Sequence, residues 1–344
     1  MRENLNHAYS HTDTDNQQLQ QSWQQQLQTA FSTVQDLCDY LELAIENLPF
    51  SLSAQQHFAF KVPLSFAACM EKGNANDPLL RQVLPTTDET ETISGFSLDP
   101  VGDLAAKAVT GVIHKYHGRA LLINTGSCAI NCRYCFRRHF PYSDWQLSKQ
   151  QEQSALDYLS ADSNLHEVIL SGGDPLLLND DRLGSLLSRL AALPQLKRLR
   201  LHSRLPIVLP ARITDTLLTA LKQTGKPTTL VVHCNHANEL NPRVFGVCQQ
   251  LRQHGIHLLN QSVLLKGVND NVTALAQLSE RLFDFGIQPY YLHLLDKTTG
   301  TAHFEVSEND ALALMQALKT LLPGYLVPKL VKEVAGDKAK QVLA

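Results

Sequence analysis

Six short strand-like segments alternate with helix-like segments through the second half of the chain, and this alternation constrains the fold most. Amphipathic stretches such as 181–192, 214–223, 243–254 and 273–285 separate most of the strands. Parallel strands need crossover connections, usually helices, so the pattern predicts a parallel α/β sheet. Six units fall short of an eightfold barrel, so we expect a partial (β/α)6 TIM-like barrel. The strand-like segments are 120–125, 168–171, 198–202, 229–234, 257–264 and 289–294.

An extension precedes these units. The chain has 344 residues, which exceeds the usual size of a single core but suits one barrel with an extension. In a glutamine-rich stretch, Leu19, Trp23, Leu27 and Phe31 recur at helical spacing, which predicts an amphipathic helix. We therefore divide the chain into a mostly helical extension (1–105), the barrel (106–300) and a C-terminal segment (301–344).

The stretch that leads into the barrel is polar and acidic. Residues 86–94 read T-T-D-E-T-E-T-I-S, a composition typical of an exposed linker. The motif D-P-V-G-D follows at 99–103. We expect an exposed linker that leads into this motif.

Composition and charge give no indication of binding to nucleic acid or to a membrane. With 44% hydrophobic and 18% charged residues and a net charge of -3, the chain shows no sign of a nucleic-acid-binding patch. No segment approaches the length of a transmembrane helix, and the first residues lack the apolar core of a signal peptide. Seven cysteines, an odd number, indicate a reducing compartment. We expect a cytoplasmic protein that binds neither nucleic acid nor membrane.

Three of the seven cysteines lie within eight residues, just after the first predicted strand. Cys128, Cys132 and Cys135 have the spacing C-x3-C-x2-C. Three thiolates on a short loop can hold an iron-sulfur cluster whose remaining iron has an open position. The alternatives are a tetrahedral zinc site completed by His139, or cysteines that are close by chance. Spacing favours the cluster, because structural zinc usually pairs C-x2-C with a second, distant pair.

Other polar residues follow later strands at the same predicted edge of the sheet. S-G-G-D-P at 171–175 follows the second strand, and His233 and Asp296 lie at or just beyond the ends of the fourth and sixth. In barrels and open parallel sheets, chemistry collects at the carboxyl ends of the strands. Paired glycines let a backbone approach a ligand and leave its amides free. The segment therefore indicates either a cradle for a polar cofactor or a tight turn.

Together these motifs resemble the radical S-adenosylmethionine (SAM) superfamily. In that superfamily the three cysteines, with an aromatic residue such as Tyr134 before the last, hold a 4Fe-4S cluster. S-G-G-D-P resembles the segment that contacts the methionine amino group of SAM. The resemblance thus implies a cluster at the three cysteines and SAM at Gly172, Gly173 and Asp174.

The resemblance narrows to the lysine 2,3-aminomutase family, and within it to members that make (R)-β-lysine for modification of elongation factor P. It covers the chain from about Phe66 onward, and the order and number of the matching stretches carry it. These are F-A-A-C-M-E-K-G with D-P-L-L-R-Q-V-L-P, D-P-V-G-D, the cysteine loop with F-R-R, S-G-G-D-P-L, H-C-N-H-A-N-E-L, N-Q-S-V-L-L-K-G-V-N-D and Y-Y-L-H-L-L-D.

This family resemblance implies a second cofactor, pyridoxal 5'-phosphate. The family carries it on a lysine near the C-terminus, which corresponds to Lys340 in K-E-V-A-G-D-K-A-K, with Lys338 as the alternative. Composition alone would have marked Lys340 as a solvated tail residue. Lys115 and Arg119 match the positions that hold the cofactor phosphate, for which a guanidinium fork and an ammonium point charge are suited. His233 is placed close to the cofactors.

The same resemblance implies how the substrate is held. Arg137 matches the arginine that receives the substrate carboxylate, where a planar fork can bind in two places. Asp296 matches a carboxylate that holds the side-chain ammonium of lysine, and Glu333 falls where the family has a second aspartate. Two carboxylates that face one ammonium select a cationic side chain.

The implied activity is that of an isomerase that moves the amino group of L-lysine from carbon 2 to carbon 3. The implied partners are L-lysine, a reductant such as flavodoxin and, indirectly, a ligase that attaches β-lysine to elongation factor P; homo-oligomer formation stays open.

One alternative is a catabolic or osmolyte-forming lysine or glutamate 2,3-aminomutase. Like charges at Asp296 and Glu333 argue against glutamate. The position of Lys340 near the chain end, with no cysteine after Cys248, favours the elongation factor P group over catabolic members with a C-terminal zinc extension. The alternative of another class is a non-catalytic metal-binding interaction protein.

Overall fold

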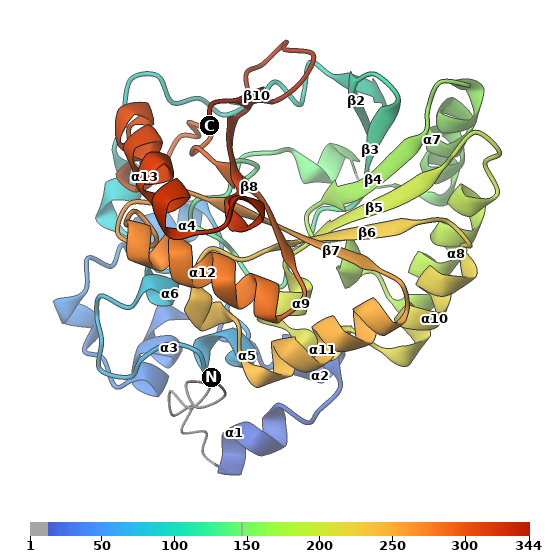
Figure 1. The fold of residues 1–344 in the computed structure, drawn as a ribbon. Helices are drawn as coiled ribbons and strands as arrows, with labels where there is room; N and C mark the ends of the chain where they lie inside the picture. The colour runs from blue at the N-terminus through green and yellow to red at the C-terminus, as the bar shows by residue number, and fades with distance from the viewer. Residues whose placement is uncertain (1–12, 146) are drawn as a thin grey trace.

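The computed structural model describes residues 13–145 and 147–344 (Figure 1). Within these residues, ten strands form one sheet and lie in the order in which they occur in the chain. The strands from β3 to β9 are parallel, whereas β1, β2 and β10 pair antiparallel with their neighbours. The strands are β1 Lys107–Val109, β2 Val112–Tyr116, β3 Arg119–Thr125, β4 Glu167–Gly172, β5 Arg198–Ser203, β6 Thr228–His233, β7 His257–Val263, β8 Gln288–His293, β9 Lys329–Lys332 and β10 Gln341–Val342.

The six predicted strands are confirmed as β3 to β8, and a helix follows each of them before the next parallel strand. The partial TIM-like barrel expected from the sequence is therefore present. The structure adds β9, a seventh parallel strand that was not predicted, because its four residues K-L-V-K are too few to show alternation. The helices of the six units are α7 Lys149–Ala161, α8 Asp180–Ala191, α10 Asp215–Gln223, α11 Pro242–Gln253, α12 Val272–Asp284 and α13 Glu308–Leu321.

Local sequence sets where these helices begin and end. Each begins after a side chain that accepts a hydrogen bond from a backbone N–H of the first turn. Gly225, Gly255 and Gly286 follow α10, α11 and α12 in the left-handed conformation that a tight exit from a helix requires. The capping residues are Ser148, Asn179, Thr214, Asn241, Asn271 and Ser307.

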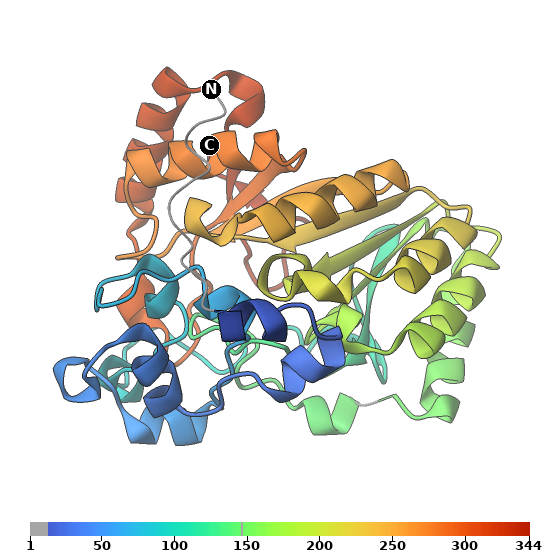
Figure 2. The same ribbon diagram turned by 90° about the horizontal axis from the view of Figure 1, so that it is seen from below.

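The helices lie on the outer side of the sheet, and the main hydrophobic core lies between them and the strands (Figures 1 and 2). In β5, Leu199 and Leu201 are buried in this core. Because successive side chains of a strand point to opposite faces, Arg200 and His202 point to the inner side. Burying each leucine contributes about 1.5–3 kcal/mol. The apolar outer face thus fixes which polar side chains line the inside of the barrel.

The N-terminal extension is built from short helices and packs against the connections at one end of the barrel, with α5 against α9 (Leu205–Val208). The single helix expected through Leu19 to Phe31 is wrong. Ser22 forms a capping box with Gln25 and starts a new helix, and Phe31 pairs with Val62 in an isolated β-bridge. The helices are α1 Asp13–Gln18, α2 Trp23–Gln28, α3 Val34–Leu41, α4 Leu52–His57, α5 Leu64–Ala67 and α6 Pro78–Arg81.

The stretch 86–94 is not wholly the exposed linker that its polarity indicated. It contains a short 3-10 helix, η3 (Thr87–Thr90), in which Glu89 is 7% exposed. Glu89 is buried because its carboxylate pairs with two arginines of the cysteine loop. No described helix has the length and apolar character needed to cross a membrane.

Candidate active site

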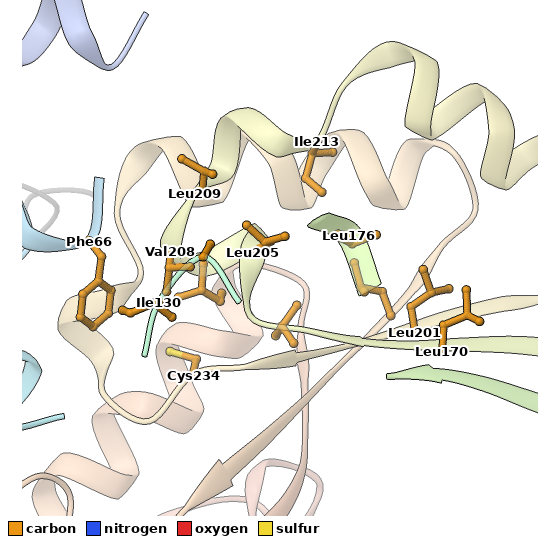
Figure 3. Close-up of a cluster of buried hydrophobic side chains, with 14 of the residues drawn as sticks. Phe66, Ile130, Leu170, Leu176, Leu201, Leu205, Val208, Leu209, Ile213 and Cys234 are labelled. Carbon is orange, nitrogen blue, oxygen red and sulfur yellow. The ribbon is translucent and has the colours of Figure 1, made fainter. Parts of the chain in front are cut away.

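The cysteine loop follows β3 directly and is anchored in the core between its thiols. Ile130 is 4% exposed and belongs to the main hydrophobic cluster. Figure 3 shows Ile130 beside Phe66, Val208 and Cys234. The loop is therefore tied to the extension, to α9 and to the end of β6 at once, while its three cysteines remain free and half-buried.

The three thiols are close enough to influence one another. Burial raises the pKa of Cys128, and nearby Cys135, Asp174 and Cys132 raise it further. Burial and Cys132 raise the pKa of Cys135 to about 11. Crowded thiolates are stabilised by a bound cationic centre, which removes their protons. This donor set of three clustered sulfur atoms fits an iron-sulfur cluster.

The zinc alternative required His139 as a fourth ligand. The His139 side chain is exposed, and its Nε2 lies 3.0 Å from the carbonyl oxygen of Thr299. Among the described residues, no group of three or more His, Cys, Asp or Glu side chains is placed so that it could hold a single metal ion.

Gly172 and Gly173 bring the end of β4 against the cysteine loop. A Cβ on Gly173 would lie 2.3 Å from the carbonyl oxygen of Ser127, and one on Gly172 would lie 2.8 Å from that of Thr125. The N–H groups of Gly173 and Asp174 donate to the same two carbonyls, of Thr125 at 2.9 Å and of Ser127 at 2.8 Å. These amides are thus used within the protein, unlike the free amides expected from the sequence. The glycines are required by the close approach of two chain segments.

Asp174 fixes the connection that follows β5. Its carboxylate accepts hydrogen bonds from Ser203 Oγ at 2.7 Å and from the N–H groups of Arg204 at 2.8 Å and Leu205 at 3.1 Å. Burial raises the pKa of Asp174, although these donors oppose the rise. Both carboxylate oxygens are occupied by protein donors, so Asp174 links the cysteine loop to the start of α9.

Four of the predicted site residues join in one chain of alternating charges. Arg137 Nε donates to Asp103 Oδ2 at 2.7 Å, and Lys115 Nζ lies 2.6 Å from Asp103 Oδ1. Lys115 Nζ also lies 3.0 Å from Glu333 Oε1, and the other oxygen of Glu333 pairs with Lys340. We call these five residues the charge chain. Asp103 was not among the predicted site residues, although it lies in the D-P-V-G-D motif.

One member of the charge chain, Glu333, lines a cavity of about 410 Å³ at the carboxyl ends of β8 and β9. Asp296 and Glu333 both line this cavity. Burial raises the pKa of Asp296 to about 7, and Lys340 opposes the rise. For Glu333, Lys340 and Lys115 outweigh burial and lower the pKa to about 2. The other lining residues are Gly95, Ser97, Pro100, Leu294, Leu295, Lys297, Glu305, Val306, Glu308, Lys332, Val334 and Ala335.

The two candidate lysines differ in their surroundings. Lys340 is half-buried and pairs with Glu333, whereas Lys338 is exposed. Arg119 is the first residue of β3 and is linked to the charge chain only through Tyr116: its guanidinium is 4.6 Å from the ring centre of Tyr116, whose side chain hydrogen-bonds Glu333. Of the two residues expected to hold phosphate, Lys115 therefore belongs to the charge chain and Arg119 does not.

Three histidines face the inside of the barrel from the ends of different strands. Burial lowers the pKa of His233 to about 3, and also lowers the pKa of His202 and His293. Lys340 adds to the lowering at His202 and His293, which places both near the charge chain. The interior thus holds neutral imidazoles. His202 and His293 were missed from the sequence, although each lies at or next to the end of a predicted strand, as His233 does.

The cysteine loop carries two further arginines that pair with Glu89. Arg133 Nε and Nη2 donate to Glu89 Oε1 at 2.8 Å and Oε2 at 2.6 Å. Arg138 Nη2 donates to the same Oε2 at 2.6 Å. Arg133 is fully buried and Arg138 nearly so. We call this group the Glu89 clamp, because it holds the loop on both sides of Cys135.

Comparison with known proteins identifies the family of this chain. Residues 122–278 match the family described as the Radical SAM superfamily. L-lysine 2,3-aminomutase of Escherichia coli (strain K12) is 49% identical over 335 residues, which are 97% of this chain and 98% of that protein. The Haemophilus influenzae enzyme of the same name is 46% identical over 325 residues, 94% of this chain and 96% of that protein. The one from Clostridium subterminale is 32% identical over 319 residues, 92% of this chain and 76% of that protein. The chain belongs to the lysine 2,3-aminomutase family of radical SAM enzymes, and it is an isomerase.

Proposed function

We propose that this protein converts L-lysine into (R)-β-lysine with a 4Fe-4S cluster, SAM and pyridoxal phosphate. Membership of the radical SAM superfamily implies the cluster and SAM. The observation that supports the rest is the charge chain, in which Asp103 pairs with Arg137 and Lys115, and Glu333 pairs with Lys115 and Lys340 and lines a cavity. These residues come from separate parts of the sequence and include cations and carboxylates suited to a zwitterionic substrate with a cationic tail.

We assign the cluster to Cys128, Cys132 and Cys135, and pyridoxal phosphate to Lys340. The cluster with SAM supplies the radical that takes hydrogen from carbon 3 of lysine, and pyridoxal phosphate supplies the conjugated system through which the amino group migrates. The protein contributes position and the exclusion of water. The half-buried thiols, anchored by Ile130, and the buried strand ends around Lys340 suit that task.

Lys340 must lose its proton to hold pyridoxal phosphate. In the structure its Nζ forms an ion pair with Glu333. A bond from Lys340 to the cofactor would replace this ion pair and would leave one oxygen of Glu333 available. Lys115 remains beside the other oxygen at 3.0 Å. We assign Lys115 and Arg119 to the cofactor phosphate and Gly172, Gly173, Asp174 and His233 to the SAM side of the site.

Arg137 and the two carboxylates select the substrate. Arg137 is 8% exposed, its Nε donates to Asp103 and its Nη1 donates to Ser171 Oγ at 3.4 Å, and we assign its remaining donors to the substrate carboxylate. Asp296 and Glu333 line the same cavity and attract the side-chain ammonium of lysine. A glutamate substrate would place a third negative charge there, so we propose lysine as the substrate.

We propose L-lysine as the direct partner and a cytoplasmic location, with a reductant such as flavodoxin. The sequence resemblance to members that serve elongation factor P supports a ligase that passes β-lysine to that factor. Deleting the gene should remove the β-lysine modification from elongation factor P, as measured by mass spectrometry of the purified factor.

The activity is tested anaerobically. Reconstituted protein with SAM, a reductant, pyridoxal phosphate and L-lysine should yield β-lysine, identified and assigned as (R) by chiral chromatography. The matched variant Cys132→Ala, which lacks one cluster ligand, should yield none. β-Lysine from Cys132→Ala, or none from a fully loaded wild-type protein, would overturn the proposal.

A further inference from the structure

We propose that Arg204 donates a hydrogen bond to the cluster ligand Cys132 and raises the reduction potential of the cluster. This inference rests on the proposed placement of the cluster at the three cysteines. Arg204 Nη1 lies 2.7 Å from Cys132 Sγ. Arg204 directly follows β5 and comes from a part of the chain remote from the cysteine loop.

The guanidinium of Arg204 is fixed in this position from several sides. Its Nη2 donates to Gln82 Oε1 at 2.7 Å and to Glu239 Oε2 at 3.0 Å. It also lies over the rings of Phe66, at 5.1 Å, and Tyr134, at 5.7 Å. Arg204 is 6% exposed, so water has little access to the bond with Cys132.

The backbone of Arg204 is held as firmly as its side chain. Its N–H donates to the Asp174 carboxylate at 2.8 Å, and the next residues form the buried helix α9. Asp174 in turn is tied to the cysteine loop through its own N–H and the carbonyl of Ser127. The segment G-G-D thus places Arg204 against Cys132, beyond any contact that it makes with SAM.

Glu239 does not depend on Arg204 alone. Its Oε1 accepts hydrogen bonds from the N–H groups of Asn235 at 2.9 Å and His236 at 3.0 Å, and from Gln82 Nε2 at 3.2 Å. The arginine therefore has a charge partner that is already well satisfied. The ion pair between Arg204 Nη2 and Glu239 does not explain why Nη1 points at the sulfur of Cys132.

A cationic donor on a ligand sulfur has a definite electrochemical effect. Reduction adds one electron to a cluster that already carries negative thiolates, and a nearby positive charge in a buried site stabilises the reduced form more than the oxidised form. Hydrogen bonds to the sulfurs are among the factors that set cluster potentials. Arg204 should therefore make the cluster easier to reduce. The Tyr134 hydroxyl, which also interacts with the Cys132 thiol, is neutral and should have a smaller effect.

The experiment compares wild type with Arg204→Gln, Arg204→Lys and Tyr134→Phe after anaerobic loading. Iron and sulfide content measure loading, and a redox titration followed by electron paramagnetic resonance (EPR) gives the midpoint potential. For Arg204→Gln we expect the one-electron reduction equilibrium to shift at least tenfold toward the oxidised form, about 59 mV more negative. Arg204→Lys should keep most of the wild-type potential, and Tyr134→Phe should shift it less than Arg204→Gln does.

A fully loaded Arg204→Gln protein with the wild-type potential would overturn the inference. A wild-type protein that binds no cluster would instead overturn the proposed function.

A second measurement covers the case in which Arg204→Gln does not load. Wild-type protein with 15N-labelled arginine should show a 15N coupling to the reduced cluster in pulsed EPR. The coupling should be lost in labelled Arg204→Lys protein, which keeps every other arginine. No coupling in the wild type, or an unchanged coupling in Arg204→Lys, would contradict the assignment to Arg204.

Discussion

The Glu89 clamp and the charge chain are two buried groups of charged residues that both include arginines of the cysteine loop. They differ in the surroundings of their carboxylates. In the Glu89 clamp, Arg133 and Arg138 surround one carboxylate, and their remaining bonds go to backbone carbonyls such as those of Phe58 and Gly300. In the charge chain, Arg137 pairs with Asp103, and Glu333 lines a cavity. Three arginines within six residues thus have two different roles, which their partners decide.

The difference between the two groups is energetic as well as spatial. A buried charge pair contributes little net stability, but removing one partner leaves the other uncompensated and costs about 3–5 kcal/mol. In the Glu89 clamp the Glu89 side chain is 1% exposed, and both its carboxylate oxygens accept hydrogen bonds from the two arginines. In the charge chain, a substrate carboxylate or ammonium can replace a protein partner. The clamp should therefore govern stability, and the chain should govern binding.

The largest expected effect is on the clamp. Glu89→Ala leaves the guanidinium groups of Arg133 and Arg138 buried without their carboxylate, so we expect the free energy of unfolding to fall by about 3–5 kcal/mol. Denaturant unfolding of the cluster-free protein measures this change. Glu91→Ala, which removes an exposed carboxylate of the same stretch, is the control and should change little. Equal unfolding free energies for wild type and Glu89→Ala would show that the clamp is not what holds the loop.

The next largest effect is on lysine binding, and it distinguishes Arg137 of the charge chain from Arg138 of the Glu89 clamp. Arg137→Gln should lower kcat/KM for lysine by about 10–150-fold, because a hydrogen bond to a charged group is worth about 1.5–3 kcal/mol. The change should lie mainly in KM. Arg138→Gln is the matched variant, and it should lower the free energy of unfolding with little change in KM. If both variants changed KM alike, the division between clamp and charge chain would be wrong.

A smaller effect concerns pH. The pKa of Asp296 is about 7, so its carboxylate gains charge between pH 6 and pH 8. The ionised form attracts the substrate ammonium, so the affinity for lysine should rise about tenfold over this range, as expected for one group titrating near 7. The same titration makes the affinity for lysine low below pH 6, where the carboxyl is protonated. Asp296→Asn should bind lysine weakly and without this dependence. Lysine titrations monitored by the pyridoxal phosphate absorbance at each pH provide the check, and an unchanged pH profile in Asp296→Asn would exclude this carboxylate as the cause.

The sequence predicted those parts of the molecule that depend on local pattern. Strands β3 to β8 have ordinary lengths of six or seven residues, with apolar residues that are continuous or alternate with polar ones, and the spacing of three cysteines is visible in eight residues. Glu89 could not be predicted, because polar neighbours suggested exposure and its partners lie more than forty residues away. Local pattern does not separate Arg137 from Arg133 and Arg138 either, since all three are basic residues of one loop, and only the family resemblance singled out Arg137.

The C-terminal residues show the same limit. A lysine near the end of a chain carries no local signal of burial, and only the resemblance to a family singled out Lys340. In three dimensions β9 brings Glu333 beside Lys115, and Lys340 lies next to Glu333. His202 and His293 could have been found by treating every strand end as His233 was treated, because the carboxyl ends of parallel strands meet at one edge.

The central claim is that the C-terminal segment completes the site that begins at the cysteine loop. Reduction with borohydride fixes pyridoxal phosphate covalently to the lysine that holds it, and peptide mapping by mass spectrometry then identifies that lysine. We predict the label on Lys340, whose amino group lies in the charge chain with Arg137. A label on Lys338, or on a lysine outside the C-terminal segment, would contradict the account.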